Sequence, residues 1–156
     1  MTARVFFITI TLSTGLFFAS CEKDKEEDNQ KPVISDLEVG HNDTIHAGEG
    51  IHLDFLASDN DLLDYYRIVI HAEDEHELKS AAEHIHWEFD SIFTEISGKK
   101  EWQVHHHDIL IPENAELGEY HFHLMVFDQA GNLAETEKEV IVAEDDGEDH
   151  EHEHED

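Results

Sequence analysis

The chain has 156 residues, with 39 acidic side chains against 9 basic ones, a formal net charge of −30, and 15 histidines. This charge excludes nucleic acid as a partner, because phosphates need lysine and arginine to replace their counterions. It also opposes direct binding to anionic lipid headgroups and favours cations as partners. Histidine is far above ordinary usage, which points to metal ions.

The first 20 residues have the pattern of a secretory signal peptide. Arg4 is their only charge, and a largely apolar run ends in Ala19 and Ser20 directly before Cys21. The run is shorter than the roughly 20 residues that a spanning helix needs. The motif Phe-Ala-Ser-Cys resembles the lipobox of bacterial lipoproteins, with phenylalanine in place of the usual leucine. The resemblance implies cleavage before Cys21 and lipid on its sulfur and new amino terminus. The alternative is a plain signal peptide followed by a chance cysteine.

Residues 21–30 are predicted to form a disordered, lipidated acidic tether. Residues 22–30 read EKDKEEDNQ and contain no apolar side chain, so they cannot bury a core. The run Lys25-Glu26-Glu27 is similar to the acidic signals that export some lipoproteins to the outer cell surface. This similarity implies outer-membrane attachment, with the outward face favoured over the periplasmic one. Cys21 is the only cysteine, so the mature fold must rest on its core or on bound metal.

Residues 31–143 are long enough for one domain and alternate apolar with polar positions. Alternation with period two, broken by turn residues, predicts an all-β fold. We expect an immunoglobulin-like antiparallel β-sandwich of about seven strands, with an insertion at residues 73–97 after the third strand. The alternating apolar residues are Val33, Leu37 and Val39; Ile51, Leu53 and Phe55; Tyr66, Ile68 and Ile70; Tyr120, Phe122, Leu124 and Val126; and Val140 and Val142.

Two resemblances support this fold. Residues 118–122, followed by Asp128-Gln129-Ala130-Gly131-Asn132, resemble the last hairpin of bacterial immunoglobulin-like and cadherin-like domains, and residues 57–62 resemble the turn after their second strand. The chain also resembles an uncharacterised family of Gram-negative lipoproteins, known as a domain of unknown function with this sandwich fold. The segments that carry this second likeness are 70–71, 107–112 and 118–123. It covers residues 31–143 and implies fold rather than function.

The sandwich topology predicts a histidine cluster at the membrane-distal pole. Residues i and i+2 of a strand share a face about 6 to 7 Å apart, so His121 and His123 can converge on one ion. Strand three should place His71 beside them. Three imidazoles with an acid or water suit zinc, and also accept copper or nickel. The further ligand candidates are His105, His107, His84 and His86. The competing interpretation is a solvated polar surface, with His106 turned inward to a hydrogen bond in the core.

Two other segments carry metal signals of their own. Residues 144–156 read EDDGEDHEHEHED and are predicted to be disordered, acting either as a weak chelator or as a solvating tail. The tail histidines are His150, His152 and His154. At the opposite pole, aspartates could supply hard oxygens to calcium or could serve as ordinary turn formers. These aspartates are Asp59, Asp61, Asp64 and Asp128.

We therefore expect a surface lipoprotein that binds a divalent transition metal, for capture or for delivery to an outer-membrane transporter. The chain has no glycine-rich phosphate loop and no His-Glu-X-X-His helix, so we expect no enzyme. Two alternatives remain open. One is an adhesion or scaffold module with solvated histidines. The other is a pH-responsive surface domain, because free histidines charge together as pH falls through about 6.5.

Overall fold

A computed structural model describes residues 27–73 and 84–144. Within these ranges the regular structure consists of strands alone. Their bounds are β1 Val33–Val39, β2 Thr44–His46, β3 Leu53–Ser58, β4 Leu63–Ala72, β5 Phe89–Phe93, β6 Glu101–His106, β7 Gly118–Asp128 and β8 Leu133–Ala143. The described part of the chain contains no helix long and apolar enough to cross a membrane. The predicted signal peptide, Cys21, and the tail from residue 145 lie outside the described residues.

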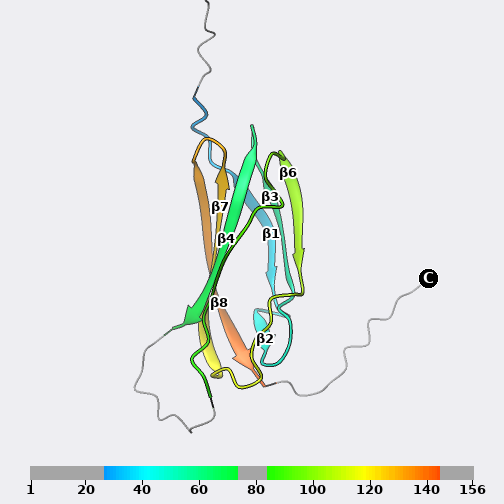
Figure 1. The fold of residues 1–156 in the computed structure, drawn as a ribbon, viewed down its shortest axis with the longest axis vertical. Helices are drawn as coiled ribbons and strands as arrows, with labels where there is room; N and C mark the ends of the chain where they lie inside the picture. The colour runs from blue at the N-terminus through cyan, green and yellow to red at the C-terminus, as the bar shows by residue number, and fades with distance from the viewer. Residues whose placement is uncertain (1–26, 74–83, 145–156) are drawn as a thin grey trace, which may run out of the picture.

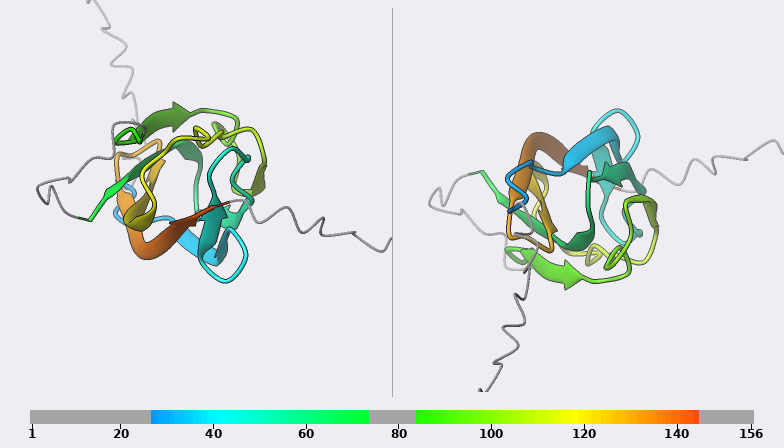
Figure 2. Two further views of the ribbon diagram at one scale, coloured as in Figure 1. Left: turned by 90° about the horizontal axis from the view of Figure 1, so that it is seen from below. Right: turned by 90° about the horizontal axis from the view of Figure 1, so that it is seen from above.

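The strands form two sheets that pack face to face, as Figures 1 and 2 show. One sheet has the order β1-β3-β6 and the other the order β2-β8-β7-β4-β5. The predicted all-β sandwich is confirmed. The sequence reading missed β2, a short edge strand that pairs in parallel with β8. The expected insertion contains β5, which extends the second sheet by pairing antiparallel with β4.

Alternation along the strands sends one set of side chains into a shared core. Along β7 the even-numbered residues from Tyr120 to Val126 are buried, and their odd-numbered neighbours lie on the outer face. Phe55 of β3 packs edge-on against Tyr66 of β4, with ring centroids 5.2 Å apart, and so joins the two sheets. Burial of each such side chain stabilises the fold by about 1.5–3 kcal/mol. The outer faces carry mostly polar side chains, with some exposed apolar ones such as Ile92 and Trp102.

The two ends of the sandwich differ in their side chains. The described N-terminal segment reaches the end that holds the β3–β4 and β7–β8 turns (Figure 1). There Asp28 accepts a hydrogen bond from Asn60 Nδ2 at 3.0 Å, and its carbonyl accepts one from Asn132 Nδ2 at 3.1 Å. Residues 27–30, which the composition assigns to the tether, therefore contact the domain. β3 and β7 begin, and β4 and β6 end, at the opposite end, where the histidines gather.

Candidate metal centre

Three histidines and an aspartate share the outer face of the β1-β3-β6 sheet. β3 and β6 are antiparallel, with Leu53 paired to His106 and Asp54 to His105. Leu53 and His106 point inward and are buried, so the residues on either side of them point outward. His52 and His107 continue the same ladder one step beyond Leu53 and His106. The register therefore places His52 beside His107, next to the Asp54–His105 pair.

Beyond the end of β6, the backbone of residues 50–51 lies close to that of residues 109–110. The amide of Ile51 donates to the carbonyl of Ile109 at 2.9 Å, and Gly50 forms a bridge with Leu110. A Cβ atom at Gly50 would lie 2.0 Å from the carbonyl oxygen of His107. Only glycine fits so close to another backbone. Gly50 thus lets the segment that carries His107 run beside the one that carries His52.

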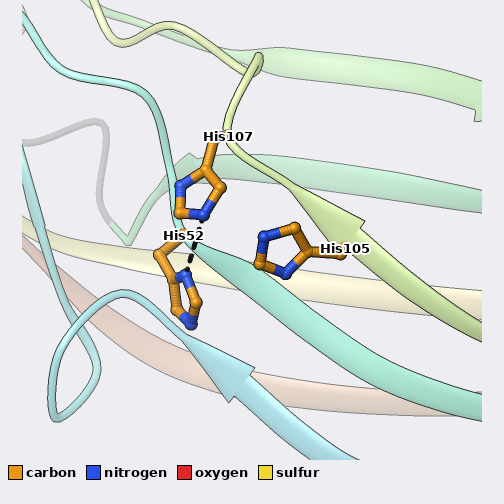
Figure 3. A group of neighbouring side chains, drawn as sticks. All are labelled: His52, His105 and His107. Carbon is orange, nitrogen blue, oxygen red and sulfur yellow. Dashed lines mark hydrogen bonds between the residues drawn. The ribbon is translucent and has the colours of Figure 1, made fainter. Parts of the chain in front are cut away.

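The three rings face one another, as Figure 3 shows. Their centroids are 4.9 Å apart for His52 and His107, 4.6 Å for His105 and His107, and 5.5 Å for His52 and His105. One ring nitrogen from each lies within 4.8 Å of the other two. Three converging imidazole nitrogens can bind zinc, copper or nickel.

Asp54 fixes the orientation of two of these rings. Nε2 of His52 lies 2.9 Å from one carboxylate oxygen, and Nδ1 of His105 donates to the other at 2.6 Å. A neutral imidazole with one nitrogen donating presents a lone pair on the other. The hydrogen bond to Asp54 therefore leaves Nε2 of His105 as an acceptor, and the nearby carboxylate favours the tautomer of His52 with its lone pair on Nδ1. Carboxylates that bind histidine in this way are the usual second layer of metal sites. Glu38 adds a further carboxylate 4.0 Å from His52 Nε2.

The spacing of the nitrogens suits a tetrahedral ion. Nδ1 of His52 is 3.3 Å from Nε2 of His107. Two nitrogens that each lie about 2.0–2.1 Å from a tetrahedral zinc are about 3.3–3.4 Å apart. The pair therefore has the separation of zinc ligands without any rearrangement of the backbone.

The structure brings His71, His121 and His123 together on the other sheet. His71 and His121 are a cross-strand pair of β4 and β7, and His123 lies on the same face two residues further along. Ring centroids are 5.4 Å apart for His71 and His121, 5.3 Å for His71 and His123, and 6.2 Å for His121 and His123. Metal binding by this group stays a prediction.

Within the described residues, neither His71, His121 and His123 nor the other predicted histidines form a group whose ligand atoms all lie within 4.8 Å of one another. Nδ1 of His84 donates weakly to the carbonyl of Ala115 at 3.4 Å. Nε2 of His86 lies 3.5 Å from a carboxylate oxygen of Glu88, and its Nδ1 lies 3.7 Å from one of Glu116. The tail histidines His150, His152 and His154 lie outside the described residues.

The predicted calcium ligands separate into two kinds. Asp59 and Asp128 lie together with Asp28, each offering one oxygen within 4.8 Å of the others. Oδ2 of Asp59 is buried and has no hydrogen-bond partner among the described residues. Asp61 is outside this group, and its backbone amide donates a hydrogen bond to Oδ1 of Asp59 at 2.8 Å. Asp64 instead accepts from the Ser97 hydroxyl at 3.3 Å. Calcium binding by Asp59, Asp61, Asp64 and Asp128 stays a prediction, of which the structure brings Asp59 and Asp128 together.

His106 is turned into the core, as its parity with Val104 predicts. Its Nδ1 donates to Asp108 at 2.8 Å, and its Nε2 lies 2.6 Å from the hydroxyl of Tyr66. The hydrogen bond from His106 lowers the pKa of Asp108. Burial, followed by the hydrogen bond to Glu95, raises the pKa of Tyr66. Both ring nitrogens of His106 are engaged, so we assign this residue a structural role. Its neighbours in the sequence, His105 and His107, are the candidate ligands.

His52 was not among the ligands predicted from the sequence, although the pattern places this residue at the start of the second strand. The signal was nevertheless present. Ile51, Leu53 and Phe55 are apolar, so His52 and Asp54 must face outward together, as His105 and His107 do. The register between the two strands, which joins these two pairs, is the part that required the structure.

Comparison with known proteins bears on this fold. Residues 19–143 match the family described as a domain of unknown function, DUF4625. The chain belongs to this family. The match covers both candidate histidine clusters and every strand of the sandwich. No curated protein matches the chain.

Proposed function

We propose that the protein is a membrane-anchored lipoprotein that binds one divalent transition metal ion through His52, His105 and His107. Zinc is the ion whose geometry agrees best with the ligands, and copper or nickel would also be accepted. The ion would be captured at the cell surface, for storage or for delivery to an outer-membrane transporter.

One observation supports this proposal above the others. Nδ1 of His52 and Nε2 of His107 are 3.3 Å apart, while Nε2 of His52 lies 2.9 Å from a carboxylate oxygen of Asp54. This combines the ligand spacing of a tetrahedral ion with the carboxylate support that metal-binding histidines have. A solvated polar surface does not require either feature.

The position of the cluster agrees with a role outside the membrane. The described N-terminal segment docks at the aspartate end through Asp28, seven positions after Cys21. Seven residues span at most about 25 Å when fully extended. If Cys21 carries lipid, the aspartate end lies near the membrane and the histidine end faces away from it. The net charge of −30 attracts cations to this surface.

Zinc titration by calorimetry tests the proposal. The starting protein is the full chain with His150, His152 and His154 changed to alanine, so that the tail contributes no imidazole. The starting protein should bind one equivalent of zinc at this site. Adding the two substitutions His52→Ala and His107→Ala to it should remove that equivalent. His86→Ala is the matched control, since it removes an imidazole between two carboxylates and should leave that site unchanged.

The opposite result is equally clear. If all zinc binding disappears when the tail histidines are replaced, the domain holds no built site. The histidines are then solvated surface, and an adhesion or scaffold module becomes the better account.

A further inference from the structure

The opposite face of the sandwich carries a second histidine cluster that shares no residue with the first. His71 comes from the end of β4, and His121 and His123 come from the start of β7. The two clusters belong to different sheets, and the packed core lies between them. An ion held by one cluster cannot be held by the other.

A carboxylate completes this second group. Glu137 of β8 pairs across the sheet with His123. Its two oxygens lie 2.9 Å from Nδ1 of His121 and 4.0 Å from Nδ1 of His123. One acidic side chain therefore reaches both imidazoles of β7. Glu139 stands opposite His121 on the same strand and adds negative charge.

One imidazole nitrogen of this cluster is poorly satisfied. Nδ1 of His121 is buried and, despite its short distance to Glu137, has no hydrogen bond of acceptable geometry. A buried polar atom without an aligned partner loses its hydration without replacement. The side chains of His121 and His123 are only 21% and 23% exposed.

His71 is oriented as a ligand. Its Nδ1 donates to the carbonyl of Ala72 at 3.0 Å, which leaves the lone pair on Nε2. Histidine ligands commonly donate their other nitrogen to a backbone carbonyl, and this bond fixes the ring and its tautomer. The ring of His71 lies at an interplanar angle of 18° to that of His123. Both rings project from the same outer face of the sheet.

We infer that His71, His121, His123 and Glu137 form a second transition-metal site, separate from that of His52. Its donors are three imidazoles and one carboxylate, whereas the first site uses its carboxylate to orient the rings. The ring centroids are up to 6.2 Å apart, against at most 5.5 Å in the first cluster. Modest ring rotation would therefore accompany binding here. The protein would carry two ions on opposite faces of one end.

The test is the stoichiometry and site assignment of zinc binding to the full chain with its three tail histidines changed to alanine. We expect two equivalents. The pair His121→Ala, His123→Ala should remove one, and the pair His52→Ala, His107→Ala should remove the other. Circular dichroism of each variant verifies that the sandwich is intact.

A conservative variant gives a second readout if the histidine pair fails to fold. Glu137→Gln keeps the shape of the side chain, and we expect it to weaken one of the two sites about tenfold or more. Glu135→Gln is its matched control, since it lies two residues earlier on the same face, opposite Met125. It should change neither site.

The outcomes separate this inference from the proposed function. One equivalent that depends on His52 alone, with Glu137→Gln silent, overturns the second site and keeps the first. One equivalent that depends on His121 alone overturns the first site and keeps the second. Binding that neither histidine pair affects overturns both.

Discussion

Nδ1 of His52 lies 3.3 Å from Nε2 of His107, although 55 positions separate the two residues in the chain. The contact exists because β3 and β6 pair antiparallel as far as Leu53 and His106, next to which His52 and His107 lie. Gly50 permits the approach, and Asp54 orients His52 from the other side. This one pair links the register of a sheet to the chemistry that we propose for the protein.

The role of Asp54 can be separated from that of the imidazoles. Asp54→Asn keeps the shape but weakens the acceptor for His52 and His105. We expect zinc affinity at the first site to fall about 10- to 100-fold, with the stability of the fold almost unchanged. Competition with a zinc chelator of known affinity measures this. The control Glu101→Gln removes an exposed charge at the far end of β6 and should have no effect. An unchanged affinity in Asp54→Asn would mean that Asp54 does not support the site.

The Tyr66 hydroxyl should contribute to stability. Tyr66→Phe leaves Nε2 of the buried His106 without its 2.6 Å contact, and we expect a loss of about 1–3 kcal/mol in the free energy of unfolding. Urea unfolding at pH 7 measures it. The control Tyr65→Phe removes the hydroxyl of the neighbouring ring, which stacks on Phe127. It should lower the free energy of unfolding by less than Tyr66→Phe does.

Tyr66 also predicts an alkaline limit to stability. Burial raises its pKa in the folded protein, so the folded state keeps the proton while the unfolded chain ionises near pH 10. The contribution is therefore complete below about pH 10 and declines as pH rises above it. Unfolding at rising pH should show this decline in the unmodified chain and a shallower one in Tyr66→Phe. Parallel curves for the two proteins would contradict it.

Two glutamates beside the second histidine cluster repel each other. The hydrogen bond and charge of Glu119 raise the pKa of Glu73, so the folded state disfavours the ionised pair at neutral pH. We expect Glu119→Gln to raise the melting temperature at pH 7 in the presence of a chelator. The gain should vanish below about pH 4, where glutamate is protonated in the unfolded chain as well. Glu101→Gln controls for net charge. An equal gain at both pH values would refute the repulsion.

The proposed membrane anchor depends on Cys21. Expressed in a Gram-negative host, the chain should enter the membrane fraction and incorporate labelled palmitate, because stable anchoring needs more than one acyl chain. Cys21→Ala should abolish the label and release the protein. If the alanine variant stays in the membrane fraction, something other than lipid on Cys21 holds it there.

Much of the architecture could be predicted from alternation alone, because period two decides which side chains enter the core of a sandwich. The same rule places His121 and His123 outward, and the neighbouring position of β4 follows from common topology. The partnership of His52 with His107 could not be predicted, since it depends on register and on Gly50. The contact of Asp28 with the turns was hidden because a short polar segment gives no periodic signal.

Anomalous diffraction at the zinc absorption edge, from crystals of the chain grown with zinc, tests the central claim most directly. We predict a peak about 2.0–2.1 Å from Nδ1 of His52 and from Nε2 of His107, with Asp54 still bound to the far nitrogen of His52. Zinc found elsewhere in the crystal, with no peak between these two rings, would contradict it.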